Sequence, residues 1–155
     1  MNKNILVVGA GISGLGAVKL SKHLNYNVRV TSRDIVRDVN KKVLRDLSVE
    51  FEEGQHSLSN LDWANLIIKS PGVPQNITLL KQARLMGISI ISEIEFAYQN
   101  TNAIIIAITG TNGKTTTAQL LHFILKRAGL NVALAGNIGV SFSESVLQNN
   151  IDYYV

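Results

Sequence analysis

The sequence predicts an α/β protein that contains two successive parallel sheets, and three observations lead to this prediction. Short apolar segments alternate with helical patterns along the chain, which favours parallel strands joined by right-handed crossovers. A glycine-rich turn, GAGISG at residues 9–14, follows the first apolar segment. A second turn, GTNGK at residues 110–114, follows the apolar run at residues 104–108. We expect a Rossmann-like unit first, and then the start of an α/β unit of the P-loop type.

Five strands and four helices are expected in the first unit, which we place at residues 1–99. The strands are expected at short apolar segments, namely residues 4–8, 28–31, 49–52, 66–69 and 89–91. The helices are expected from the first glycine turn to about residue 24, and at residues 39–47, 78–86 and 93–98. Both prolines, Pro71 and Pro74, fall in the loop after the fourth strand, where they turn and stiffen the backbone.

The polar segment at residues 99–102 separates this unit from a second one, which we place at residues 100–155. It is expected to begin with a buried strand at residues 104–108, a long helix at 114–128 and a short strand at 132–134. A glycine turn at residues 135–139, a helix at 141–147 and a last strand at 152–155 are expected to follow. A sheet strand at the very end of a chain is unusual. We therefore expect an incomplete second unit, and a chain that is the N-terminal part of a longer protein.

Composition favours a folded protein and excludes several classes of function. With 46% hydrophobic and 17% charged residues the chain can bury a core, and no apolar segment approaches the ~20 residues that a membrane helix needs. The absence of cysteine excludes disulfides, thiol catalysis and thiolate metal ligands. The net charge of +4 comes from scattered basic residues, and aromatic residues make up 6%, so a nucleic-acid partner is not expected. We expect a cytoplasmic monomer that binds neither nucleic acid nor membrane.

The second glycine turn has the residues that a phosphate-binding loop requires. Its two glycines allow backbone N–H groups to face a phosphate, and the helix that follows adds partial positive charge. Lys114 would reach the β- and γ-phosphates, and the Thr115 hydroxyl would be a ligand of Mg²⁺. The common GxxxxGK[ST] pattern would place its first glycine at Ile108, whereas here it is Gly110. The turn predicts ATP and Mg²⁺ binding through residues Gly110, Thr111, Asn112, Gly113, Lys114, Thr115 and Thr116.

The first glycine turn has the GxGxxG spacing of dinucleotide-binding proteins, at residues 9, 11 and 14. In those proteins an acidic residue ends the second strand and holds a ribose hydroxyl. Here Thr31 takes that place, and Arg33 and Asp34 follow it. The turn therefore fits an NADP-type pocket, another ligand with a pyrophosphate, or a tight strand–helix connection that binds nothing.

Four motifs in this order resemble the Mur ligases and their folylpolyglutamate synthetase relatives. They are GTNGKTT after the apolar run, SPGV at residues 70–73, EIEF at residues 93–96 and GNIG at residues 136–139. Together with the N-terminal glycine turn, they are most similar to the branch of the family that adds D-glutamate to UDP-N-acetylmuramoyl-L-alanine in peptidoglycan synthesis. The L-alanine-adding branch also has an N-terminal glycine loop, but it usually carries histidine at the position of Asn112.

The resemblance implies an ATP-dependent ligase of cell-wall synthesis that activates a carboxylate as an acyl phosphate, which an amine then attacks. Lys114 would be catalytic, because it would stabilise the charge on the moving phosphoryl group. The same resemblance implies that the first unit binds the UDP part of the substrate. Its binding residues would be Gly11, Ile12 and Ser13 at the pyrophosphate, Thr31, Ser32 and Arg33 at the uridine, Ser70, Pro71 and Gly72 along the same ligand, and Asn137 at the sugar-phosphate part.

Family members are much longer than this chain. The further magnesium ligands and the D-glutamate-binding domain that the family implies have no counterpart in these residues, so the chain alone is not expected to complete the reaction. Three alternatives remain open from the sequence. They are an L-alanine-adding Mur ligase, an NADP-dependent oxidoreductase domain, and a nucleotide-binding module without enzymatic activity.

Overall fold

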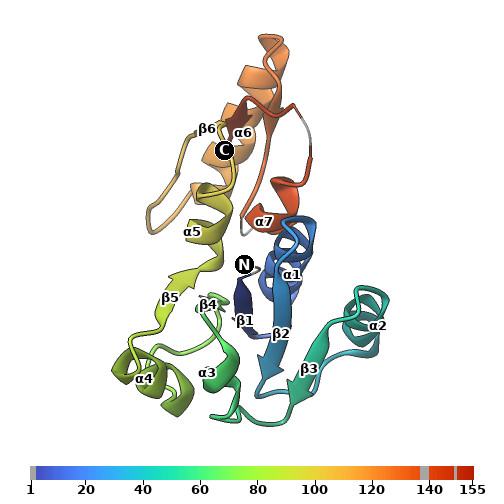
Figure 1. The fold of residues 1–155 in the computed structure, drawn as a ribbon. Coiled ribbons are helices and arrows are strands. Elements are labelled where there is room, and N and C mark those ends of the chain that lie inside the picture. The colour runs from blue at the N-terminus through green and yellow to red at the C-terminus, as the bar shows by residue number, and fades with distance from the viewer. Residues whose placement is uncertain (1–2, 137–139, 149) are drawn as a thin grey trace.

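The computed structural model describes residues 3–136, 140–148 and 150–155. It contains two sheets with helices around them (Figure 1). The larger sheet has the strand order β3-β2-β1-β4-β5, and the smaller has the order β6-β8-β7. All strand pairs in the described residues are parallel. The expected α/β class is therefore confirmed.

The larger sheet and its helices occupy the first part of the chain. Its strands are β1 (Asn4–Val8), β2 (Asn27–Ser32), β3 (Glu50–Glu53), β4 (Leu66–Lys69) and β5 (Ser89–Ser92). Its helices are α1 (Ile12–His23), α2 (Asp38–Asp46), α3 (Asn60–Trp63), α4 (Thr78–Leu85) and α5 (Glu93–Tyr98). The strand order reverses between β1 and β4, and ligands of such sheets bind at that switch point, beyond the carboxyl ends of the strands.

Both faces of the larger sheet are covered, which explains why its central strands are continuously apolar. Ile5 and Val7 of β1 point into a core that α1, α2 and Phe96 of α5 complete. Leu6 and Val8 point to the other face, into a core that contains residues of α3 and α4. Burial on both faces fixes the register of β1, and with it the position of the glycine turn that follows.

Two glycines of α1 allow close packing. A Cβ atom on Gly14 would lie 1.9 Å from the carbonyl oxygen of Gly9, so α1 approaches the end of β1 more closely than any side chain would allow. A Cβ atom on Gly16 would lie 1.8 Å from Ser141 Oγ, at the start of α7 (Phe142–Ser145). The first contact fixes α1 against the sheet, and the second lets α7 rest on α1.

The smaller sheet contains β6 (Ile104–Ile105), β7 (Val132–Ala133) and β8 (Tyr153–Tyr154), and α6 (Lys114–Arg127) joins the first two. The expectation of a buried five-residue strand at residues 104–108 was wrong. The strand has two residues, and Ile104 is 58% exposed. The strand β6 is an edge strand, which pairs only with β8 among the described residues. The helix expected at residues 141–147 is shortened to α7, and turns follow it.

The helix α7 also ties the two sheets together, since it packs against α1 and α5 (Figure 1). Glu93 Oε1, at the start of α5, accepts a hydrogen bond of 2.6 Å from the backbone N–H of Ser143. Lys19 of α1 forms an ion pair of 2.5 Å with Glu144. Despite the polar segment at residues 99–102, the two units are thus in direct contact. No helix in the described ranges is long and apolar enough to cross a membrane.

Candidate nucleotide-binding site

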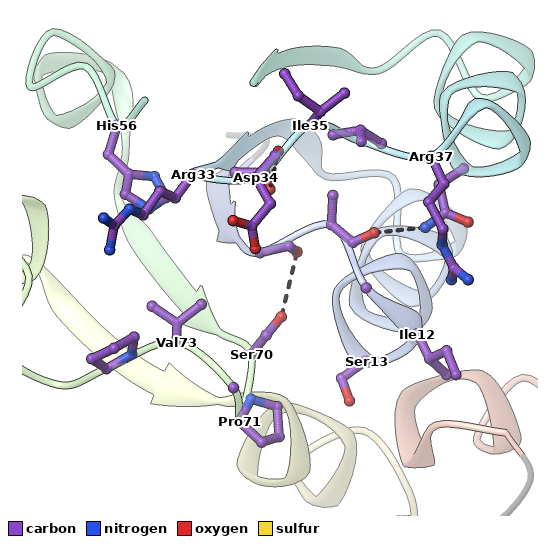
Figure 2. Close-up of a pocket in the computed structure, with 18 of the residues that line it drawn as sticks. Ile12, Ser13, Arg33, Asp34, Ile35, Arg37, His56, Ser70, Pro71 and Val73 are labelled. Atoms are coloured by element: carbon purple, nitrogen blue, oxygen red, sulfur yellow. Dashed lines mark hydrogen bonds between the residues drawn. The ribbon is translucent and has the colours of Figure 1, made fainter. Parts of the chain in front are cut away.

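A cleft of about 740 Å³ lies at the carboxyl edge of the larger sheet, at the switch point between β1 and β4. Three loops form most of it, namely the glycine turn after β1, the segment after β2 and the proline-containing loop after β4, and His56 from the segment after β3 completes the lining (Figure 2). Most of the predicted substrate residues line it, namely Gly11, Ile12, Ser13, Ser32, Arg33, Ser70, Pro71 and Gly72. The fold therefore brings together residues that are as far as 61 positions apart in the sequence.

The glycine turn presents the N-terminus of α1 to this cleft. Gly9 has a φ of +101°, a conformation that side chains other than glycine rarely adopt. Gly11 is the N-cap and supplies no side-chain cap, so the first N–H groups of the 12-residue helix stay available to a ligand. The first turn contains no acidic residue. Partial positive charge at this end of α1 suits a pyrophosphate.

Hydrogen bonds from neighbouring elements hold the turn in place. Asn40 of α2 donates from Nδ2 to the carbonyl oxygen of Ala10 at 2.8 Å, and Ser70 Oγ lies 3.4 Å from the carbonyl oxygen of Gly9 (Figure 2). The backbone that would contact a phosphate is thus fixed before a ligand arrives, which lowers the entropic cost of binding.

Lys69, the last residue of β4, organises the loop on the opposite side of the cleft. It is 8% exposed, and its Nζ donates to the carbonyl oxygens of Ser70 at 2.9 Å and Val73 at 2.8 Å. Burial lowers the pKa of this ammonium group. Sequence reasoning missed Lys69. A lysine that ends an otherwise apolar strand, directly before a proline-containing loop, was the signal that could have identified it.

Of the three predicted binding residues at the end of β2, two line the cleft and one is buried in the interior. Ser32 and Arg33 line the cleft, and Ser32 Oγ donates to the carbonyl oxygen of Asp34 at 2.9 Å. Thr31 does not line the cleft, because its side chain is fully buried and points toward β3. There Thr31 Oγ1 lies 3.0 Å from Glu52 Oε2 and 2.8 Å from His56 Nδ1. His56 itself lines the cleft, and sequence reasoning had not included it.

The environment sets the charges of these two partners of Thr31. Burial by itself would raise the pKa of Glu52, but hydrogen bonds from Ser57, Thr31 and Gln55 outweigh it and lower that pKa. Burial lowers the pKa of His56, and Arg33 contributes in the same direction, while Glu52 and Asp34 oppose it. Glu52 is therefore charged and His56 neutral at neutral pH.

The phosphate-loop residues border a second cleft, of about 420 Å³. Lys114 and Thr115 line it together with Glu93, and Ser13 and Pro71 line both clefts. The other predicted loop residues lie outside its lining and are exposed to solvent: Gly110, Thr111, Asn112, Gly113 and Thr116. Asn137 lies outside the described residues.

The loop itself has the backbone that two glycines allow. Gly110 and Gly113 have φ values of +149° and +77°, and Gly113 is the N-cap of α6. Lys114 Nζ donates to the carbonyl oxygens of Gly110 and Thr111, so the ammonium group folds back over its own loop. A helix N-terminus, a lysine and a threonine hydroxyl thus gather at one edge of the second cleft.

Comparison with known families agrees with this geometry. The model of the Mur ligase MurD-like N-terminal domain matches residues 3–92, which is more than half of the chain. The chain belongs to the Mur ligase family. The model of the Mur ligase middle domain matches residues 108–155. The family resemblance expected from the sequence motifs is thus confirmed.

Curated relatives of this Mur ligase chain include two named UDP-N-acetylmuramoylalanine–D-glutamate ligase. The protein from Bacteroides fragilis is 45% identical over 153 residues, which are 99% of this chain and 34% of the relative. The protein from Cytophaga hutchinsonii is 41% identical over 157 residues, which cover 100% of this chain and 35% of the relative. The chain therefore spans about a third of the length of the curated relatives it matches.

Solved structures of Mur ligases share the fold. The UDP-N-acetylmuramate:L-alanyl-gamma-D-glutamyl-meso-diaminopimelate ligase from Neisseria meningitides superposes with a TM-score of 0.66 at 20% identity, over 100% of this chain and 52% of that one. A pseudomurein peptide ligase type C from Methanothermus fervidus has a TM-score of 0.59 at 25% identity, over 99% of this chain and 32% of that one.

Proposed function

We propose that this chain supplies the uridine-nucleotide site and the ATP loop of a ligase that adds D-glutamate to UDP-N-acetylmuramoyl-L-alanine in the cytoplasm. Residues 1–99 form the substrate-binding domain in this proposal, and residues 100–155 form the N-terminal part of the ATP-binding domain. The observation that carries it is the 45% identity, over 99% of the chain, to a protein with that printed name. The cleft at the switch point is the structural support.

In the first cleft, the pyrophosphate of the substrate lies at the N-terminus of α1. The backbone N–H groups of Ile12 and Ser13 donate to its oxygens, since they have no acceptor within the helix. Ser32 and Arg33 border the uridine end, and the loop at Ser70 forms the opposite wall. Thr31 acts from behind the cleft, through His56, rather than by touching the ligand.

At the second cleft, the residues present fit a nucleoside triphosphate and Mg²⁺. The first N–H groups of the 14-residue helix α6 and the Lys114 ammonium group are donors for phosphate oxygens, and the Thr115 hydroxyl is an oxygen ligand of the kind Mg²⁺ prefers. When bound, the ion neutralises charge on the phosphates. Lys114 leaves the loop carbonyls that it contacts here and stabilises the charge on the transferred phosphoryl group.

This arrangement suits an amide-forming ligase because a carboxylate is unreactive toward amines. Transfer of the γ-phosphoryl group to the substrate carboxylate gives an acyl phosphate, and attack by the D-glutamate amine then releases phosphate. The clefts share Ser13 and Pro71, so a long substrate held in the first cleft can extend toward the ATP loop. Residues for D-glutamate are left to the part of the longer relatives that this chain does not span.

The first test is calorimetric titration of the chain with UDP-N-acetylmuramoyl-L-alanine, and with NADPH in parallel. We expect saturable binding of the uridine compound alone, weakened about tenfold or more in Arg33→Ala through loss of a charge-assisted contact. Arg45→Ala, on α2 and outside the cleft lining, is the matched control and should bind as the parent does. Binding of NADPH alone would overturn the proposal in favour of a redox domain.

The ATP loop is tested separately. Lys114→Ala should weaken ATP binding about tenfold or more, because it removes a charged donor to the phosphates. Lys126→Ala, near the other end of the same helix, should leave it unchanged. Tighter binding of UDP-N-acetylmuramate than of its L-alanine derivative would instead favour the L-alanine-adding branch of the family.

A further inference from the structure

Hydrogen-bond counting at Thr31 fixes the tautomer of His56. Thr31 Oγ1 lies 3.0 Å from Glu52 Oε2, 3.1 Å from the carbonyl oxygen of Gln55 and 2.8 Å from His56 Nδ1. A hydroxyl has one proton to donate, and a carboxylate and a carbonyl can only accept. If that proton went to Nδ1, two acceptor oxygens would face the lone pairs of Oγ1. The proton therefore goes to one of these oxygens, and His56 Nδ1–H donates to Oγ1.

With Nδ1 protonated, Nε2 of the neutral imidazole carries a lone pair and is an acceptor. Nε2 is the ring nitrogen that is not engaged by Thr31, and His56 lines the cleft. No donor among the described residues hydrogen-bonds to Nε2. An acceptor of this kind seeks an N–H or O–H group of a ligand.

The position of His56 indicates which part of the ligand it meets. Figure 2 shows His56 and Arg33 at one end of the cleft, well away from Ile12 and Ser13 at the start of α1. If the pyrophosphate lies at α1, as in the proposed function, the nucleoside end lies toward His56. A uracil ring offers one N–H, at N3, between two carbonyl oxygens. The lone pair of Nε2 complements that N–H, and the Arg33 guanidinium is a donor for a neighbouring carbonyl oxygen.

We propose that His56 is a specificity-determining residue, whose Nε2 accepts a hydrogen bond from the N3–H of uracil and thereby selects uracil over cytosine. In cytosine, N3 is itself an acceptor, so two lone pairs would face each other. Thr31 is the positioning residue, because it holds the tautomer that leaves Nε2 free of a proton. This inference rests on the proposed uridine-nucleotide site and names the residue that reads the base.

The test is titration of the chain with UDP, CDP and N3-methyl-UDP. We expect UDP to bind about tenfold or more tightly than the other two, which is the usual cost of losing one hydrogen bond and leaving a polar group unpaired. His56→Phe should bring the three affinities within about twofold of one another. Gln55→Ala, at the exposed neighbour, keeps its backbone carbonyl and should retain the full difference. Thr31→Val should reduce the difference without removing the imidazole.

A measurement on the unaltered chain complements the variants. Nitrogen NMR of ¹⁵N-labelled histidine should show Nδ1 protonated and Nε2 free of a proton at neutral pH, and the Nε2 resonance should move on addition of UDP but not of CDP. Absence of any UDP binding would overturn the proposed function, and this inference with it. If the chain bound UDP and CDP equally well, or if His56→Phe still preferred UDP to CDP, the role of His56 would be overturned and the proposed function would stand.

Discussion

The two sheets of this chain differ in how completely they are covered. In the larger sheet, β1 and β4 are buried along almost their whole length, and α1 buries residues on several sides. In the smaller sheet, β6 is an edge strand, and of the α6 residues, all of which the structure describes, Ala118 alone is buried. Parallel strands draw their stability from cover on both faces. The first unit therefore has the core of an independent fold, and the second depends on contacts with the first.

The two candidate sites also differ in how well neighbouring elements support them. The cleft of the larger sheet is formed by loops that Asn40 and Lys69 hold from behind. The phosphate loop is exposed, and the hydrogen bonds of Lys114 Nζ within the described residues go to carbonyl oxygens of its own loop. On the proposed function, we therefore expect the chain to bind the uridine compound more tightly than ATP.

The largest effect should come from closing the gap between α1 and β1. Gly14→Ala places a Cβ atom 1.9 Å from a backbone oxygen that cannot rotate away, so we expect a loss of about 3 kcal/mol or more in the free energy of unfolding. Urea denaturation followed by circular dichroism measures it. Gly72→Ala, where a Cβ atom meets nothing within 4 Å, is the control and should change stability by less than about 0.5 kcal/mol. Equal effects of the two would contradict the packing seen here.

The second-largest loss of stability should come from breaking the contact between the two units. Glu93 is 1% exposed, and Glu93→Ala leaves the buried N–H of Ser143 without its acceptor, at a cost of about 2 kcal/mol. We expect faster amide exchange in α7 and the smaller sheet, and unchanged protection in β1 and β4. Glu93→Gln keeps an acceptor oxygen and should therefore lose less stability than Glu93→Ala. If exchange rose equally in both sheets, the units would be unfolding together.

A smaller effect should appear as a dependence on pH. The pKa of Glu52 is lower in the folded chain than its ordinary value of 4.5, so its contribution to stability is present above that value and is lost as the pH falls through the folded pKa. Glu52→Gln should be less stable than the parent at pH 6, and the gap should narrow toward pH 3. Thermal unfolding across this range tests the sign.

The smallest effect is expected on the uncovered face of α6. Phe123 is 56% exposed, so Phe123→Ser should change the free energy of unfolding by less than about 0.5 kcal/mol. Leu44→Ala, in the covered core of the larger sheet, should cost about 3 kcal/mol. Urea denaturation midpoints of the two variants measure these losses and so compare the packing of the two units. A large loss in Phe123→Ser would mean that this face is covered in solution.

Sequence patterns predicted the larger sheet well because four of its strands contain at least two apolar residues, whereas β3, with the sequence EFEE, contains only Phe51. The helix α5 was predicted at its observed residues, where Ser92 is the N-cap and its Oγ accepts from the Glu95 N–H. The short α3 was missed, since four residues are too few to show helical periodicity. The length of the strand at residue 104 was overestimated, because an apolar run does not say how many of its residues pair with a neighbouring strand.

For the candidate cleft, the motifs identified the loops but not all of the side chains in them. Ser70, Pro71 and Gly72 were predicted correctly as loop residues, because proline and glycine interrupt regular structure locally. His56 and Lys69 were missed, because their roles depend on partners from other strands or on burial that no local pattern reports. Thr31 was assigned to the ligand through the family resemblance of residues 31–33, which does not say which of these side chains faces the interior. The individual binding assignments stay predictions.

The strand order of the smaller sheet has a consequence for synthesis on the ribosome. The strand β8 lies between β6 and β7, so neither of those two strands has a neighbour to pair with until Tyr153 and Tyr154 have emerged. The larger sheet, by contrast, has all of its strands once Ser92 is made. The nascent chain can thus complete its first sheet before β6 and β7 have a strand with which to pair. The order of translation sets the order of folding, and the first sheet becomes the surface on which the second assembles.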